Sequence, residues 1–173
     1  MSDTLVTIIA IALAAILMFV FPLMTMSDRT DDVSQLTVET ATTEFVDEIR
    51  TTGKITEDKY NKFIEAIGST GNTYNVEMEV QILDENPGKK TTQSTKDKIG
   101  ENVYYSVYTS QIEDKLIKDE VYKLKEGDIV SVSVKNTNQT LAQQLKNFFY
   151  KVVGNDTYTI AASHGGIVTA TAK

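Results

Sequence analysis

An uncharged, apolar run near the N-terminus, residues 5–24, limits what this chain can fold into more than any other feature. A helix of that length is roughly 30 Å long, which matches the hydrocarbon thickness of a bilayer. Within lipid a lone segment must satisfy its own backbone hydrogen bonds, so it must be helical. The run is too long for the core of a signal peptide, and no basic region precedes it. We therefore predict a membrane-spanning or filament-core helix.

The alternative interpretation of this run is a fully buried core helix in a soluble protein. The rest of the chain suffices for one ordinary domain, which is too small to surround such a helix on all sides. We accordingly divide the chain into two parts. Residues 1–26 form the transmembrane or filament-core helix, and residues 27–173 form an amphipathic continuation of that helix with a soluble α+β domain.

Composition removes several classes of function. The chain has 173 residues and a net charge of −7, whereas binding to nucleic acid or to anionic lipid requires clustered Lys and Arg. It contains no Cys and a single His, His164. The lack of Cys excludes disulfides and thiolate metal sites. A single His leaves few ligands for a His-based metal site and few residues for a catalytic triad. We expect no nucleic-acid partner and no cofactor.

Apolar residues resume with a helical period after the polar segment 25–32. The members of this predicted stripe are Val33, Leu36, Ala41, Phe45 and Ile49, flanked by Val38 and Val46. Gly53 is the expected C-cap. Because no Gly separates the stripe from the apolar run, we predict one long helix over about residues 4–52, broken or kinked near Pro22 and Asp28.

A second, shorter helix and a strand follow. Thr56 is the predicted N-cap of the helix and Gly68 its end. Its predicted buried face consists of Tyr60, Phe63, Ile64 and Ile67. Over residues 74–82 apolar and polar side chains alternate, which predicts a half-buried strand.

The next segments are predicted from composition. Residues 84–100 hold no apolar side chain before Ile99 and are expected to form a long loop. Residues 103–108 predict a second strand, whose three tyrosines either line a ligand surface or serve as ordinary strand formers. These tyrosines are Tyr104, Tyr105 and Tyr108. Residues 111–118 are ambiguous, with helical composition but little length.

Two hairpins are predicted in the C-terminal part. The first pairs residues 120–125 with residues 128–135 around a Glu126-Gly127 turn. It places Val130, Val132 and Val134 on one face. The second pairs residues 157–162 with residues 167–172 around a turn at residues 163–166.

Between the hairpins, Thr140 caps a predicted helix that runs to Val153 and is closed by Gly154. Its apolar side is expected to contain Leu141, Leu145, Phe148, Phe149 and Val152. The predicted fold class is α+β. It combines a long N-terminal helix, hydrophobic then amphipathic, with a small antiparallel β-sheet domain and two or three short helices.

No arrangement typical of catalysis emerges from the sequence. His164 lies in the second predicted turn, where an exposed His is ordinary and only Asp156 is a candidate partner. The acidic pairs Asp31-Asp32, Asp47-Glu48 and Glu113-Asp114 lack the pattern of an EF-hand loop. No Gly-rich segment resembles a phosphate-binding loop. We expect no catalytic, cofactor-binding or metal-binding residue, and no enzymatic activity.

The layout resembles that of type IV pilin-like proteins and, more loosely, of the small pseudopilins of tight-adherence (Tad) pilus systems. The matching features are the apolar run with Pro22 inside it, the amphipathic continuation over residues 33–49, and the later strands. The resemblance implies that the N-terminal helix first anchors the subunit in the membrane and later packs in a filament core. It also implies that the second half of this helix lies against an antiparallel sheet.

Two features depart from the pilin pattern. The short basic leader that ends in Gly is missing, so either it has been removed or it never existed. Pilins usually carry a Glu five residues into the mature chain, which pairs with the terminal amine of a neighbour, and here Leu5 holds that position. Asp3 is the one acid nearby and is the candidate for such a pairing.

Small residues within the apolar run would allow close approach between helices. The predicted membrane and assembly residues are Leu5, Ile8, Ile9, Ala12, Ala14, Ala15, Ile16, Phe19 and Pro22. The expected function is that of a structural subunit of a pilus-type filament. Its expected partners are further copies of itself in a helical homopolymer, membrane lipid before assembly, and other pilus components.

Two alternatives from other classes stay open. A membrane-tethered extracytoplasmic binding or secretion accessory module would not polymerise, and a tethered hydrolase would need an acid/base pair that the fold brings together. Arg29, just after the apolar run, favours a cytoplasmic domain. The polar, Thr- and Asn-rich domain and the pilin resemblance favour the opposite side. We expect a single-pass membrane protein with an extracytoplasmic domain, and a surface filament when it is assembled.

Overall fold

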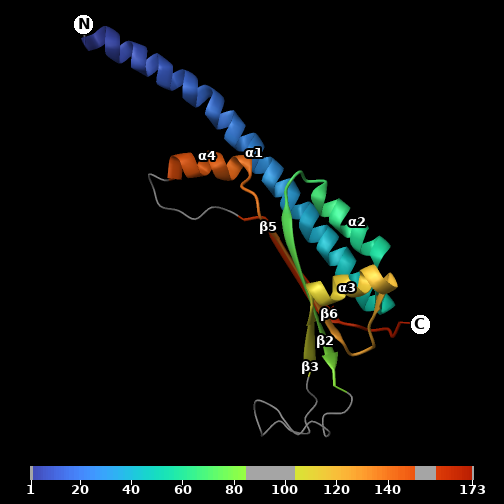
Figure 1. Ribbon diagram of the computed structural model, residues 1–173. Coiled ribbons are helices and arrows are strands. Elements are labelled where there is room, and N and C mark those ends of the chain that lie inside the picture. The colour runs from blue at the N-terminus through green and yellow to red at the C-terminus, as the bar shows by residue number, and fades with distance from the viewer. Residues whose placement is uncertain (1, 85–103, 151–158, 173) are drawn as a thin grey trace, which may run out of the picture.

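The computed structural model describes residues 2–84, 104–150 and 159–172. In chain order its elements are α1 (Ser2–Thr52), β1 (Lys54–Thr56), α2 (Glu57–Gly68), β2 (Tyr74–Leu83), β3 (Tyr104–Tyr108), α3 (Thr109–Asp119), β4 (Val121–Lys123), β5 (Ile129–Asn136), α4 (Leu141–Tyr150) and β6 (Ala161–Ile167). The long N-terminal helix packs against an antiparallel sheet (Figure 1), which confirms the α+β prediction. The predicted loop, apart from Asp84, and the segment 151–158 lie outside the described residues.

The predicted long helix is confirmed: α1 is continuous through Pro22 and Asp28 and curves gently (Figure 1), so it is not broken there. Pro22 removes one backbone donor, and the hydrogen bonds of the flanking turns keep the helix intact. In the following turn the Thr25 hydroxyl donates to the Phe21 carbonyl at 3.1 Å. The helix ends as predicted at Gly53, which has a left-handed φ of 66° and donates its N–H to the Ile49 carbonyl at 2.8 Å.

The core-facing side of α1 differs from the predicted stripe. Val33 and Leu36 are each 65% exposed, and the prediction that they face the core is wrong. The buried line recurs every three or four residues and consists of Ser27, Asp31, Ser34, Val38, Thr42, Phe45 and Ile49. Four of these seven residues are polar, so a search for apolar spacing does not find the line. The hydroxyls of Ser34 and Thr42 donate hydrogen bonds to backbone carbonyls of the preceding helical turn.

The main sheet has the strand order β3-β2-β5-β6 with antiparallel neighbours, and a small second sheet joins β1 to β4. The inner face of the main sheet packs on the second half of α1. Val130, Val132 and Val134 are fully buried there, which confirms the predicted register of β5. Phe45 of α1 stacks on Phe63 of α2 with ring centroids 4.5 Å apart.

Both predicted hairpins are wrong. Strand β4 pairs with β1 instead of β5, and the Leu124 N–H extends this pairing by donating to the Gly53 carbonyl at 2.7 Å. Strand β6 runs straight through residues 163–166 and pairs with β5 along its length. Its glycines permit close approach. A Cβ on Gly166 would lie 2.6 Å from the Arg50 side chain, and one on Gly165 would lie 2.9 Å from the Val130 carbonyl oxygen.

Short helices complete the domain. Thr56 caps α2 as predicted, and Phe63 and Ile67 are buried, but Ile64 is exposed. The ambiguous segment 111–118 lies within helix α3. Thr140 caps α4 through a reciprocal pair of bonds with Gln143, at 3.2 and 3.1 Å.

Of the predicted apolar side of α4, the structure describes Leu141 and Leu145, and neither is fully buried. Ala142 and Gln143 are buried instead, and Leu141 is 51% exposed. The side chains of Phe148 and Phe149, together with Val152, Val153 and Gly154, lie outside the described residues. Helix α4 as described ends at Tyr150.

Candidate assembly site on the N-terminal helix

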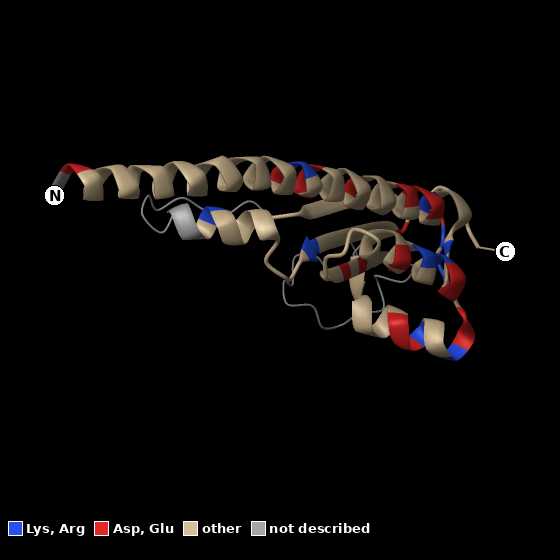
Figure 2. Ribbon diagram, turned by 90° about the horizontal axis from the view of Figure 1, so that it is seen from above, with Lys and Arg blue, Asp and Glu red and all other residues tan. Residues whose placement is uncertain are grey.

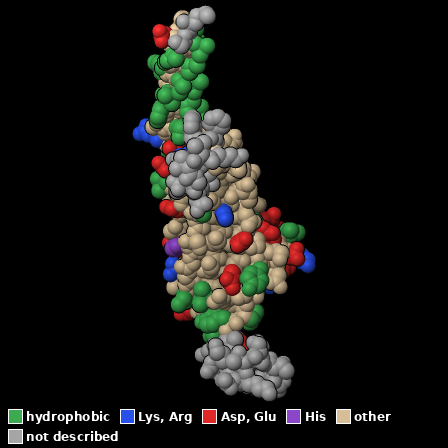
Figure 3. All heavy atoms as spheres, turned by 90° about the vertical axis from the view of Figure 1, so that its left-hand side faces the viewer, with side chains coloured by type: hydrophobic (Ala, Val, Ile, Leu, Met, Phe, Trp, Pro, Cys, Tyr) green, Lys and Arg blue, Asp and Glu red, His purple; other side chains and the backbone are tan. Residues whose placement is uncertain are grey.

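The first half of α1 projects beyond the domain (Figures 1 and 3) and is covered with hydrophobic side chains. Residues 3–19 are all exposed, and Phe19 reaches 76%. Every predicted assembly residue, Leu5, Ile8, Ile9, Ala12, Ala14, Ala15, Ile16, Phe19 and Pro22, lies on this projection and is exposed. Among the described residues, α1 is the one helix that is long and apolar enough to cross a membrane, with a mean hydropathy of 2.8 over its most apolar window. A signal segment would meet the same criterion.

The helical period separates these residues into two faces. Positions 5, 8, 12, 15, 19 and 22 recur every three or four residues and therefore share one side of α1. Ala14 lies on the opposite side. The small residues Ala12 and Ala15 thus fall between larger apolar neighbours on the shared side, where another helix could approach closely.

The first and second halves of α1 differ in charge. Asp and Glu are frequent from the middle of the helix onward, whereas the first half carries charge only at its N-terminus (Figure 2). That charge is Asp3, which is exposed in the first turn, where an acid interacts favourably with the helix dipole. Its pairing with the amine of a neighbouring subunit stays a prediction.

A buried polar cluster fixes α4 to α1 where the projection ends. The Thr140 hydroxyl donates to a carboxylate oxygen of Asp31 at 2.6 Å, and both side chains are buried. Six residues further along, in the middle of α4, the Lys146 ammonium lies 2.6 Å from a carboxylate oxygen of Asp28. Sequence reasoning missed this cluster. Polar residues at the core-facing period, Ser27, Asp31 and Ser34, are the pattern that could have indicated it.

His164 lies in the middle of β6 and not in an exposed turn, so that prediction is wrong. Its Nε2 is 3.4 Å from a carboxylate oxygen of Asp47 on α1. Arg50 also binds Asp47, at 2.8 Å, and donates its Nε–H to the Ile167 carbonyl at 3.1 Å. These contacts join α1 to the neighbouring strand. Asp156, the candidate partner named from the sequence, lies outside the described residues.

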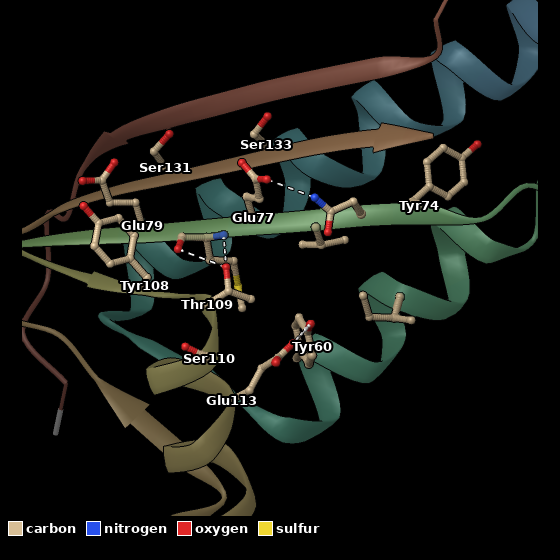
Figure 4. Close-up of a pocket in the computed structure, with 14 residues that line it drawn as sticks. Tyr60, Tyr74, Glu77, Glu79, Tyr108, Thr109, Ser110, Glu113, Ser131 and Ser133 are labelled. Carbon is tan, nitrogen blue, oxygen red and sulfur yellow. Dashed lines mark hydrogen bonds between the residues drawn. The ribbon is translucent and has the colours of Figure 1, made fainter. Parts of the chain in front are cut away.

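A shallow groove lies on the outer face of the sheet between β2, α2 and α3 (Figure 4). The Tyr60 hydroxyl donates to a carboxylate oxygen of Glu113 at 2.6 Å. Burial and that carboxylate raise the pKa of Tyr60 far above its ordinary value. Of the three tyrosines in the second predicted strand, Tyr108 lines the groove. No group of three or more His, Asp or Glu in the described part of the chain could hold a metal ion.

The carboxylates of the groove are engaged by neighbouring side chains. Glu79 accepts from the Ser106 hydroxyl at 2.6 Å, and Glu77 accepts from the Asn75 amide at 3.0 Å. Thr109, at the start of α3, accepts the Met78 N–H at 2.7 Å. The groove therefore combines hydrogen-bonded polar groups with apolar side chains such as Ile64 and Val76.

Comparison with known protein families, with characterised proteins and with solved structures found no match to this chain. Its architecture is nevertheless pilin-like, because a long apolar N-terminal helix packs with its second half against an antiparallel sheet.

Proposed function

We propose that this protein is a structural, non-catalytic subunit of a pilus-type surface filament that polymerises through the first half of α1. The observation that carries the proposal is the fully exposed apolar projection, which continues without a break into the domain core. Apolar surface in contact with water costs about 25 cal/mol per Å². A projection of this size therefore requires lipid or further copies of itself around it.

The two environments would follow one another. Before assembly the projection would span the membrane with the domain on the extracytoplasmic side, and in the filament it would pack against copies of itself. Lipid tails are as apolar as Leu, so association of the helices must rely on close packing. Ala12 and Ala15 supply small residues for that purpose. Asp3 is the residue we assign to pairing with a neighbour's amine, and other pilus components would assist the transfer.

The alternative is a membrane-tethered module that does not polymerise. The groove of Figure 4 favours it, because its open surface carries the hydroxyls of Ser131 and Ser133, which could bind a ligand. The two functions differ in what cells that make the full chain carry on their surface.

Electron microscopy of sheared surface material, with gold-labelled antibody against the domain, tests the proposal. Labelled filaments support a structural subunit. If the antibody finds the chain only in the membrane fraction and no filament carries label, the filament proposal fails and the tethered module takes its place.

A further inference from the structure

Helix α4 lies against α1 at the point where the exposed projection ends. Its start is fixed by the Asp31–Thr140 bond and its middle by the Asp28–Lys146 pair. Figure 1 shows that the far end of α4 points back toward the projecting half of α1. The helix therefore leaves the domain at the level of the junction and does not cover the sheet.

The composition of α4 differs from that of the other short helices. Lys146 is the single charged residue among its ten, and it is paired with Asp28. By contrast, α2 has five charged residues among twelve and α3 has five among eleven. The other polar residues of its first two turns, Gln143, Gln144 and Asn147, are uncharged.

The exposed residues in the described part of α4 are Leu141 and Gln144. Ala142 and Gln143 face inward and are buried, whereas Leu141 is 51% exposed and Leu145, one turn later, is half-buried. Residues four apart on a helix share a side. Leu141 and Leu145 therefore form a short apolar strip on this side of α4, next to the exposed Gln144.

We propose that α4 is an interfacial helix whose Leu141–Leu145 side rests in the headgroup region of the bilayer. The inference rests on the membrane-anchored stage of the proposed function. The apolar run ends at Met24, and Asp28, which holds α4, follows roughly 6 Å further along the helix axis. Around an anchored subunit this level is occupied by lipid headgroups, where amphipathic helices bury their apolar side.

The chemistry of the contact follows from the charges. The chain is acidic, and the one cation of α4 is already paired, so attraction to anionic headgroups contributes little. The apolar side supplies the contact instead. Binding should accordingly occur on zwitterionic lipid and fix the tilt of the domain over the membrane.

The absence of Cys allows a single spin label to be placed at will. The full chain is reconstituted at one copy per phosphatidylcholine nanodisc, with a label introduced by Leu145→Cys. Matched controls are Ile16→Cys in the projection and Ile117→Cys, which is 77% exposed on α3. The measured quantity is the ratio of collision rates with oxygen and with a water-soluble nickel chelate. The label at 145 is expected to give a ratio between the two controls and several-fold above that at 117.

The experiment has three possible results, and each leads to a different conclusion about α4 or about the membrane anchor. A label at 145 that meets the nickel chelate as freely as the one at 117, while the label at 16 stays shielded, overturns the role of α4 and leaves the anchor intact. A label at 16 open to nickel overturns the anchored stage itself. Protection at 145 in single-copy discs supports the inference, because no second copy is present to cause it. Leu141→Cys gives the same measurement should the 145 variant misfold.

Discussion

The Thr140 hydroxyl donates a hydrogen bond to the carboxylate of Asp31, a residue 109 positions earlier in the chain, and both side chains are buried. This bond ties the start of α4 to the helix that carries the apolar projection. The same hydroxyl accepts the Gln143 N–H at 3.2 Å and so also caps α4. The position of α4 thus depends on two residues that lie in different parts of the sequence.

Asp31→Ala should lower the free energy of unfolding by about 1–3 kcal/mol, because it leaves a buried hydroxyl without its acceptor. Denaturant unfolding of the full chain in detergent micelles measures the loss. Thr140→Ser, which keeps both roles of the hydroxyl, is the matched control and should be nearly neutral. Equal stability of the Asp31→Ala variant and the parent would show that the bond contributes nothing.

Val132→Asp should unfold the domain. Val132 is 0% exposed on the inner face of β5, and an unpaired carboxylate there costs several kcal/mol, comparable with the stability of a small domain. Ser133→Asn, on the outer face opposite Glu77, adds no charge and should melt like the parent. Circular dichroism during heating compares them, and identical melting curves would contradict the inward placement of Val132.

Gly53→Ala should be far more destabilising than Gly71→Ala, although both glycines have a left-handed φ. At Gly71 a Cβ meets nothing within 4 Å, so the cost is the conformational one of roughly 1–2 kcal/mol. At Gly53 the Cβ would lie 2.2 Å from the Ala170 carbonyl oxygen, which adds a backbone clash. Chemical denaturation of both variants gives the difference, and similar losses would rule out the contact with the C-terminal segment.

Stability should fall as the pH rises above 10. The pKa of Tyr60 is raised in the folded state by burial and by Glu113, from an ordinary value of 10.0. Unfolded chains therefore lose this proton first, and the stabilisation, fully present below pH 10, declines above it. Burial also raises the pKa of Tyr122, so Tyr60→Phe should reduce the slope of stability against pH without abolishing it. Unfolding curves at pH 9 and pH 11 test this, and an unchanged slope in Tyr60→Phe would exclude Tyr60 as a source.

Ala12→Leu should abolish filaments while the chain accumulates in the membrane. The substitution keeps the hydrophobicity but fills the space between larger residues on the side of α1 that carries Leu5, Ile8 and Phe19. Ala14→Leu makes the same change on the opposite side and should be tolerated. Microscopy of sheared material and membrane fractionation of the same cells read out both effects. Filaments lost only with Ala14→Leu would move the contact to the other side.

Much of the fold was predictable because the local sequence patterns agree with the elements that form in the folded protein. The apolar run, the Gly53 cap, the Thr56 and Thr140 caps and the alternation of β2 and β5 each report on their own neighbourhood. In these segments the residue types that favour the element also provide its buried face.

The failures share a physical cause, since they concern contacts between distant segments. Val33 and Leu36 fit a helical stripe, yet the core side of α1 is set by the domain that packs on it and carries Ser27, Asp31 and Ser34. Gly165 and Gly166 suggested a turn, but they make room for Val130 and Arg50. The partner of β4 was missed because β1 is three residues long and lies far back in the chain.

Because α1 is one continuous helix, it connects the apolar projection rigidly to the domain. Because no flexible hinge separates the apolar half from the half that packs on the sheet, one residue inserted between them would rotate the domain by about 100° and shift it by about 1.5 Å. The rotation angle between a given side of the exposed apolar half and the outer face of the sheet is therefore set by the number of residues between them. The number of residues in this segment thus determines how the domain is oriented on the projection. Insertions there should be as disruptive as substitutions in the core.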